Sequence, residues 1–344
     1  MQNKKTLLER LSQDVVLGAE GYIYELERRG YIKAGPYVPE VVLDHPTAVT
    51  QLHREYMRAG AEVMVALTYY AYRDKMKDVS REGELETLNR QAVRLAKKVA
   101  KEGQALVAGN ISNTWSYDAE SKQQSSEHVR RMYAEQVGWA ADEGVDLVIA
   151  ETLEYMGEAL IALEVIKSFD LPAIVTLAPS GAKSRDGYDW AEICRELDDQ
   201  GADVVGLNCI QGPASVMPTL KKIRKTVRGY VAAQPVPYRT TPQYPHFQYI
   251  KSDESGEVVP PFELEPYLMT RSEMADFAVI AKRIGINYIG ICSGSSPHHV
   301  RAMAEALGRT VPASRYSPDM KRHAQLGSED FVKNYHGGFL EDKL

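Results

Sequence analysis

The sequence predicts an α/β protein with a single domain, a (β/α)8 TIM barrel. Five times, an amphipathic stretch ends at a glycine and is followed a few residues later by a short β-branched run. Three further apolar runs bring the number of expected strands to eight. Continuous apolar runs are typical of parallel strands that are buried on both faces, and eight of them alternating with helices favour a closed barrel.

The eight expected strands are short and evenly distributed along the chain. In order, they cover residues 15–17, 63–67, 105–108, 145–150, 173–176, 204–207, 230–233 and 288–291. The helices before five of them end at Gly60, Gly103, Gly144, Gly201 and Gly285. A doubly wound open sheet is the alternative, but no Gly-x-Gly-x-x-Gly motif follows the first strand.

The expected domain organisation is simple. We expect the barrel to cover residues 1–312, and residues 313–344 to form a C-terminal tail or an oligomerisation arm, most simply in a homodimer. Residues 235–270, rich in proline and tyrosine, lie between the seventh strand and the next helix. Segments of this length are usually lids or binding loops.

The composition excludes several classes of protein. A formal net charge of −6 gives no basic footprint, so nucleic acid is not an expected partner. No run approaches the roughly 20 apolar residues that span a bilayer, and the first ten residues lack the apolar core of a secretory signal. The three cysteines are odd in number and far apart, so they form no disulfide framework. We therefore expect a cytoplasmic protein without a membrane partner.

A barrel carries its catalytic groups just past the C-terminal ends of its strands. Polar or reactive residues follow the expected strands at Glu20, Tyr69, Tyr70, Asn110, Glu151, Asn208, Cys209, Gln234 and Cys292. The sulfur atoms of Cys209 and Cys292 could converge on one zinc ion, which would hold a substrate thiol as the thiolate needed for alkyl transfer to sulfur. Packing of both cysteines as small apolar residues is the equally supported alternative.

Tyrosines form a second pattern. Tyr22, Tyr37, Tyr69 and Tyr70 fall in the first two strand–helix units of a chain with 20 tyrosines and only 6 phenylalanines. Several aromatic faces around a small cavity attract a quaternary ammonium group, with on the order of 0.5–2 kcal/mol for each contact. Tyrosines that keep their hydroxyl groups in water at a rim are the alternative.

Two more polar residues complete the expected catalytic set. Glu151 follows the apolar run 147–150, and a carboxylate at this position could bind the ammonium group of an amino-acid substrate. Asn208 precedes Cys209 and is expected to orient the site through a hydrogen bond.

Several longer segments resemble the homocysteine S-methyltransferase family. The likeness runs from about Leu7 to about Leu307 and is clearest in residues 25–36, 51–55, 206–209, 264–271 and 288–306. The resemblance is closest to the members that use betaine. It implies a zinc-dependent (β/α)8 barrel.

The resemblance also implies roles for single residues. The family takes its three zinc-binding thiolates from the motifs Gly-x-Asn-Cys and Gly-Gly-Cys-Cys-Gly. Cys209 and Cys292 match two of the thiolates, and Ser293 stands at the position of the third. Glu151 matches the acidic residue that binds the homocysteine amino group. Aromatic positions of the betaine pocket are matched by Tyr37, Tyr69 and Tyr70, and Tyr22 matches an aromatic residue just after the first strand.

The first strand departs from the family as well. Where the family has Gly-Asp-Gly, this chain reads Gly18-Ala19-Glu20-Gly21. Strands one and eight are neighbours in a closed barrel, so we expect Glu20 and Ser293 to lie close together. One hypothesis makes Glu20 a catalytic residue that replaces the missing thiolate with an oxygen ligand. The other is that the serine leaves the metal weakly bound or absent.

The functional expectation is an S-methyltransferase of methionine biosynthesis. It would move a methyl group from a small betaine-like onium donor to a thiol acceptor, most simply homocysteine. The donor leaves as a neutral amine or sulfide, so no general acid is needed. Two alternatives stay open: a related methyltransferase or demethylase that uses another acceptor because its zinc site is altered, and a quaternary-ammonium binding protein without turnover.

Overall fold

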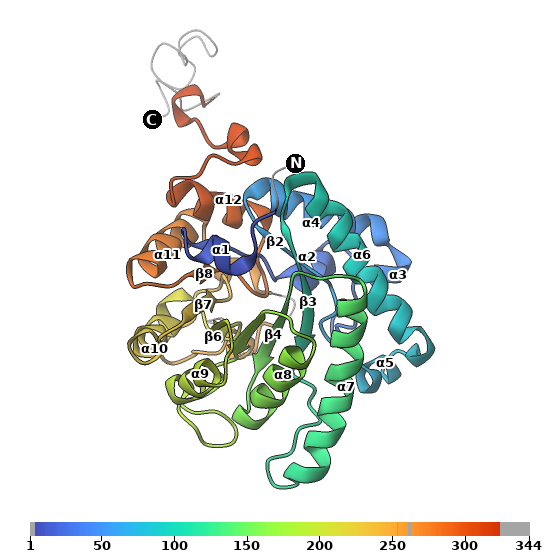
Figure 1. The fold of residues 1–344 in the computed structure, drawn as a ribbon. Coiled ribbons are helices and arrows are strands. Elements are labelled where there is room, and N and C mark those ends of the chain that lie inside the picture. Colours follow the sequence, from blue (N-terminus) through green and yellow to red (C-terminus); the bar gives the residue numbers. More distant parts are fainter. Residues whose placement is uncertain (1–3, 253, 261–262, 324–344) are drawn as a thin grey trace.

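Eight parallel strands form the centre of the molecule, and helices surround them (Figure 1). The computed structural model describes residues 4–252, 254–260 and 263–323. The strands are β1 (Val16–Leu17), β2 (Val63–Val65), β3 (Leu106–Ser112), β4 (Leu147–Leu153), β5 (Ala173–Leu177), β6 (Val204–Asn208), β7 (Tyr230–Gln234) and β8 (Tyr288–Ile289). Each overlaps an expected segment, so the prediction of a single-domain (β/α)8 barrel is confirmed.

The strand order wraps the sheet into a barrel. Neighbouring strands pair in parallel in the order β1-β8-β7-β6-β5-β4-β3-β2. The remaining seam lies between β1 and β2, where the backbone N–H of Glu62 donates to the carbonyl oxygen of Leu17 over 2.8 Å. Since all the strands run in the same direction, their C-terminal ends meet at one mouth.

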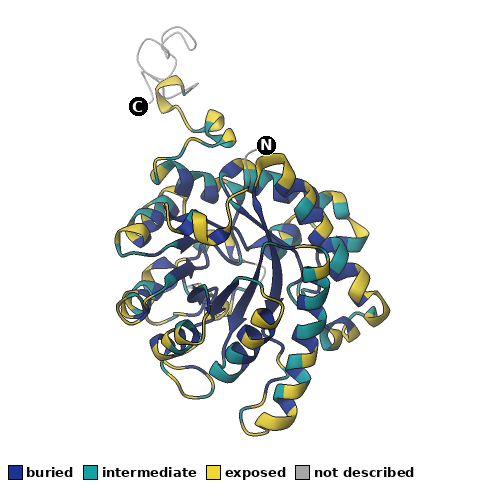
Figure 2. Ribbon diagram, viewed as in Figure 1, coloured by how far each residue is buried: buried dark blue, intermediate teal, exposed yellow. Residues whose placement is uncertain are grey.

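The helices cover the outside of the barrel and bury one face each, whereas the strands are almost wholly buried (Figure 2). The helices are α1 (Leu7–Leu11), α2 (Tyr22–Arg28), α3 (Val41–Asp44), α4 (Pro46–Ala59), α5 (Arg73–Lys77), α6 (Leu85–Gly103), α7 (Lys122–Asp142), α8 (Met156–Ser168), α9 (Trp190–Asp199), α10 (Pro213–Thr226), α11 (Arg271–Arg283) and α12 (Pro297–Ala306). Short 3-10 helices are η1 (Glu82–Glu84), η2 (Phe247–Tyr249), η3 (Glu265–Tyr267), η4 (Pro312–Tyr316) and η5 (Met320–Arg322). In the described part of the chain, no helix is long and apolar enough to cross a membrane.

Local sequence signals explain where the helices begin and end. At the start of α11, the side chain of Thr270 accepts a hydrogen bond from the N–H of Glu273, and the Glu273 carboxylate accepts one from the N–H of Thr270. At the end of α4, Gly60 has a φ of 114°, a left-handed conformation that glycine adopts without strain. Such stops return the chain to the next strand within a few residues.

Strands β3 and β4 extend further than their apolar runs predict. The runs predict ends at residues 108 and 150, whereas the strands continue to Ser112 and Leu153. Asn110 and Glu151 therefore lie within strands rather than after them. Both side chains are buried and hydrogen-bonded to each other, so polar residues here do not end the strands.

The long segment 235–270 forms part of the barrel mouth. The rings of Tyr238 and Phe247 stack with their centroids 5.4 Å apart, in a small apolar cluster that includes Cys209 and Cys292. The expected binding loop is therefore packed against the region that holds the two cysteines.

The C-terminal tail expected at residues 313–344 lies mostly outside the described residues. Its described part contains η4 and η5, and a hydrogen bond of 3.2 Å from Arg301 Nη1 to the carbonyl oxygen of Tyr316 joins it to α12.

Candidate active site

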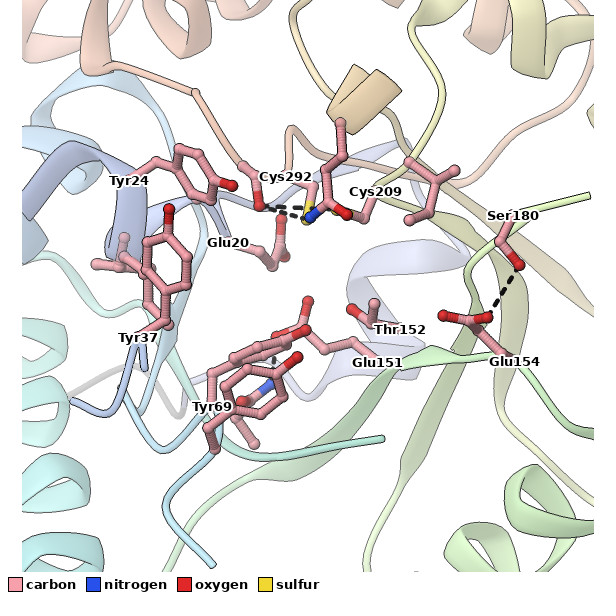
Figure 3. Close-up of a pocket in the computed structure, with 18 of the residues that line it drawn as sticks. Glu20, Tyr24, Tyr37, Tyr69, Glu151, Thr152, Glu154, Ser180, Cys209 and Cys292 are labelled. Carbon is pink, nitrogen blue, oxygen red and sulfur yellow. Dashed lines mark hydrogen bonds between the residues drawn. The ribbon is translucent and has the colours of Figure 1, made fainter. Parts of the chain in front are cut away.

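A cavity of about 330 Å³ opens at the C-terminal ends of the strands. Figure 3 shows carboxyl groups, sulfur atoms and tyrosine rings from different segments of the chain around a common space. Ten residues singled out from the sequence line it: Glu20, Tyr22, Tyr37, Tyr69, Tyr70, Asn110, Glu151, Cys209, Cys292 and Ser293. The position is that of the active site in a barrel enzyme.

Backbone strain is concentrated around this cavity. Nine non-glycine residues in the described part of the chain have a positive φ, and six of them line the cavity. These six are Tyr37, Tyr70, Trp115, Thr152, Cys209 and Ile210. A positive φ is a genuine outlier for a β-branched residue such as Thr152 or Ile210. Residues held in such conformations cluster at functional sites, where the surrounding structure maintains them.

Two asparagines hold the carboxyl group of Glu151. Asn110 Nδ2 donates to Oε1 over 2.6 Å, and Asn208 Nδ2 lies 3.3 Å from Oε2. The amide of Asn208 is itself oriented, because its Oδ1 accepts from the N–H of Thr152 at 2.8 Å. Burial raises the pKa of Glu151 well above its usual value, and nearby negative charges add to this effect. No lysine or arginine among the described residues pairs with this carboxylate.

The carboxyl group of Glu20 lies between two glycines of neighbouring strands. A Cβ atom at Gly18 would lie 2.4 Å from Oε1, and one at Gly290 would lie 2.5 Å from Oε2. The hydroxyl of Tyr288 donates to Oε1 over 2.7 Å, whereas Oε2 is buried without a hydrogen-bond partner. Burial raises the pKa of Glu20 to about 7. The two glycines therefore leave the space that this carboxyl group occupies.

The two cysteines meet at Ser293. The Ser293 Oγ lies 3.6 Å from Cys209 Sγ and 3.9 Å from Cys292 Sγ. Interaction with the Cys292 thiol lowers the pKa of Cys209, and the same interaction raises the pKa of Cys292. The pair therefore titrates as a unit, with Cys209 the more acidic member. The convergence of the two thiols expected from the sequence is present.

These donors fit a zinc ion in part. Catalytic zinc normally has three protein ligands of the Cys, His, Asp or Glu type. Within residues 4–252, 254–260 and 263–323, no group of three such side chains could hold a metal. Glu20 does not form such a group with the two cysteines in this structure, so its role as a third ligand stays a prediction. Its Oε1 is bonded to Tyr288, whereas its Oε2 has no hydrogen-bond partner. Two soft sulfur donors and a weak serine oxygen remain.

Tyrosine rings form the wall beside α2. Tyr24 stacks on Tyr37 with ring centroids 5.4 Å apart, and the rings of Tyr69 and Tyr70 lie 4.3 Å apart. Tyr22 borders the cavity, but its hydroxyl lies 3.1 Å from His53 Nδ1 on α4, so its polar end is turned toward the helix. Tyr24 is the ring that sequence reasoning missed. It lies two residues after Tyr22 in α2, a spacing that does not place two side chains on one helix face, so the sequence pattern gave no signal for it.

The residues of the opposite wall are not singled out individually in the sequence, although three of them belong to the expected binding loop at residues 235–270. Glu154, Ser180 and Arg185 line the cavity there, together with Trp115 from the segment after β3 and His246, Gln248 and Tyr249 from the long loop. Glu154 follows β4 and Ser180 follows β5, so their positions at strand ends were the available signal.

A buried carboxyl group, two paired thiols and a wall of tyrosines at the mouth of a (β/α)8 barrel define an enzyme site suited to group transfer onto sulfur. The model of the homocysteine S-methyltransferase family matches residues 18–307, and the chain belongs to this family of methyltransferases.

Named relatives cover most of the chain. Betaine–homocysteine S-methyltransferase 1 of Xenopus tropicalis is 37% identical over 336 residues, which is 94% of this chain and 80% of the relative. S-methylmethionine–homocysteine S-methyltransferase BHMT2 of Rattus norvegicus is 36% identical and covers 90% of this chain and 85% of its own length. The metallated form of the homocysteine methyltransferase MmuM from Escherichia coli has a TM-score of 0.65 at 20% identity, over 85% of this chain and 96% of its own. At that identity, the likeness shows the fold alone.

Replacing Glu20 with glutamine is expected to remove part of the pH dependence of stability. With a pKa of about 7 in the folded protein against an ordinary value of 4.5, Glu20 keeps a proton that the unfolded chain has released. Wild-type stability should therefore fall as the pH rises from about 4.5 to about 7, by on the order of 3 kcal/mol from this group. Glutamine cannot ionise, so Glu20→Gln lacks this contribution.

Urea unfolding at pH 5 and pH 8 measures the difference between the two proteins. Glu82→Gln is the matched control, because Glu82 is exposed and should leave the pH dependence unchanged. Parallel pH dependences for wild type and Glu20→Gln would show that the buried carboxyl group does not titrate in this range.

Proposed function

We propose that the protein transfers a methyl group from a betaine-like onium donor to homocysteine and so produces methionine. One observation carries the proposal: the carboxyl group of Glu151 and the thiols of Cys209 and Cys292 share a cavity with tyrosine rings. Such a cavity offers an ammonium site and a thiol site to the acceptor, and an onium site to the donor. The relatives named for this reaction support the assignment.

Glu151 would bind the ammonium group of homocysteine. An ionised carboxylate accepts up to about four hydrogen bonds, so the two asparagines leave room for further donors. Asn208 connects the two ends of the acceptor site, because its Nδ2 lies 3.3 Å from Glu151 Oε2 and 3.8 Å from Cys292 Sγ. A bound ammonium group would also offset the burial that raises the pKa of Glu151.

The rings of Tyr24, Tyr37, Tyr69 and Tyr70 would surround the onium group of the donor. Each cation–π contact contributes about 0.5–2 kcal/mol, and more when water is excluded. The methyl carbon leaves the donor nitrogen or sulfur as it bonds to the acceptor sulfur, and the bonding electron pair departs with the neutral leaving group. Binding both substrates in line would supply much of the rate by proximity.

The proton of the acceptor thiol needs a base, and Glu20 is our proposed acceptor for it. Glu20 lines the cavity, and its Oε2 has no hydrogen-bond partner. With a pKa of about 7, the carboxylate form is well populated at neutral pH, which suits a general base.

Zinc is the cofactor that we propose for the thiol pair. Cys209 and Cys292 would hold it, with the hydroxyl of Ser293 as a weak further ligand. Bound there, zinc would keep the acceptor sulfur in its thiolate form. The metallated form of the Escherichia coli homocysteine methyltransferase supports a metal in a relative of the same fold.

We also propose that residues 1–312 form the catalytic barrel, that residues 313–344 serve as an arm in a homodimer, and that the enzyme works in the cytoplasm. All three cysteines are free thiols, which suits a reducing compartment.

Methyl transfer can be observed directly. Incubation of the protein with homocysteine and glycine betaine carrying ¹³C-methyl groups is expected to yield labelled methionine and dimethylglycine in NMR spectra. Tyr69→Ala removes one aromatic face and should lower kcat/KM for betaine about threefold to thirtyfold. The KM for homocysteine should change little.

Tyr31→Ala is the control for this experiment, because Tyr31 is exposed and does not line the cavity.

Two other functions, methyl transfer to another acceptor and binding without turnover, are suggested by Ser293 at the third ligand position. Turnover only with another methyl acceptor would favour a different methyltransferase. Thermal stabilisation by betaine without any product would favour a binding protein.

Ser293→Cys is expected to strengthen metal binding, because it supplies a third thiolate beside Cys209 and Cys292. After zinc-supplemented expression and dialysis, the variant should retain close to one equivalent of zinc in elemental analysis, and the wild type clearly less. Ser255→Cys, on an exposed turn, controls for the added thiol. Equal zinc contents in wild type and Ser293→Cys would mean that the third ligand position does not limit metal affinity.

A further inference from the structure

Figure 3 shows Glu154, a buried carboxylate, on the side of the cavity away from Tyr24 and Tyr37. Glu154 is only 5% exposed. It accepts a hydrogen bond of 2.9 Å from the Ser180 hydroxyl and another from Nε of Arg185. None of these three residues has a part in the reaction described above.

The loop that carries Arg185 is fixed at several points. The backbone N–H of Arg185 donates to the carbonyl oxygen of Glu154 over 2.9 Å. The next residue, Asp186, accepts from the backbone N–H groups of Met156 and Gly157 at 3.0 and 3.1 Å, at the start of α8. The guanidinium group is thus held from both its backbone and its side chain, which lowers the entropy cost of using it to bind a ligand.

Aromatic contacts connect this arginine to the tyrosine wall. The Arg185 guanidinium lies 5.4 Å from the centroid of the Trp115 ring. Trp115 Nε1 donates to the Tyr70 hydroxyl over 2.9 Å, and Tyr70 lies beside Tyr69. Trp115 has a positive φ of 59° and is 54% exposed. Residues with such a backbone conformation cluster at functional sites, which makes Trp115 a candidate for contact with a ligand.

Arg185 is the one arginine or lysine among the described residues that line the cavity, whereas Glu20, Glu151 and Glu154 supply three carboxyl groups. A guanidinium has five N–H donors, and the hydrogen bond to Glu154 uses the one on Nε. The neighbouring hydroxyl of Tyr155 can occupy one more. The side chain is 48% exposed, so the remaining donors can pair with a second carboxylate in the bidentate geometry that arginine favours.

We propose that Arg185 binds the carboxylate of a zwitterionic methyl donor whose onium group lies among the tyrosine rings, at the side where Tyr70 meets Trp115. This inference rests on the proposed function and narrows its donor class to short onium carboxylates, of which glycine betaine is one. The contacts of Arg185 are with Trp115 and Glu154 rather than with Glu151 or the cysteines. They therefore favour the carboxylate of the donor over that of the acceptor.

Calorimetric titration of the full-length protein separates the two substrates. Glycine betaine and tetramethylammonium differ in the carboxylate, as do homocysteine and 3-aminopropane-1-thiol. Arg185→Gln should weaken betaine binding about tenfold or more, because a hydrogen-bonded ion pair is lost. Binding of tetramethylammonium and of both thiols should stay within about twofold. Arg185→Lys should recover only part of the betaine affinity, since it keeps the charge but not the planar fork.

Arg130→Gln is the matched control, because Arg130 lies on the outer surface of α7 and pairs with Glu164. A lower thermal midpoint for Arg185→Gln than for the wild type would reveal a folding defect. In that case, the betaine affinity of Arg185→Lys is compared with that of the wild type instead. Equal losses for betaine and tetramethylammonium would overturn the proposal, and so would a selective loss for homocysteine, which would assign Arg185 to the acceptor.

The titrations and the assay for methionine formation together distinguish failure of this inference from failure of the proposed function. Selective loss of betaine affinity without any methionine formation would support the carboxylate site and reject the proposed reaction. Methionine formation by the wild type, with unchanged betaine affinity in Arg185→Gln, would support the proposed reaction and reject the carboxylate site.

Discussion

Burial of the Glu151 carboxyl group is the constraint on which the rest of the site depends. An unpaired charge in this position would cost several kcal/mol, and the protein lowers that cost with amide groups from β3 and β6 rather than with a cation. For Asn110 to reach Glu151, strands β3 and β4 must continue past their apolar runs, as they do. No arginine or lysine in the described part of the chain pairs with Glu151, and under the proposed function the ammonium group of the acceptor would provide this cation.

Under the proposed function, the cavity would separate two kinds of cation recognition. Glu151 would accept hydrogen bonds from a primary ammonium group, whereas the tyrosine rings would suit an onium group, which has no hydrogen bond to donate. Two glycines make room for a third carboxyl group: that of Glu20 fits only because Gly18 and Gly290 lack side chains. The strained backbone at six lining residues is maintained by the rigid barrel beneath them.

Much of this arrangement could be predicted from the sequence, because strand ends in a barrel converge regardless of loop details. The eight strands and the meeting of Cys209 with Cys292 follow from this rule. The rule does not give the hydrogen-bond partners of buried side chains: Oε1 of Glu20 accepts a hydrogen bond from Tyr288 on β8, a contact that no pattern in the sequence indicates. Trp115 and Arg185 come from irregular loops, whose path depends on contacts such as the one between Asp186 and α8. No periodicity encodes such contacts.

We propose that Glu151 binds the ammonium group of the acceptor, and the rest of the proposed function depends on this contact. The most direct measurement is calorimetric titration of wild type and Glu151→Gln with homocysteine and with 4-mercaptobutanoate, which lacks the amino group. We predict that the substitution weakens homocysteine binding at least about tenfold and leaves the analogue's affinity unchanged within about twofold. Equal affinities of wild type and Glu151→Gln for homocysteine would contradict the account.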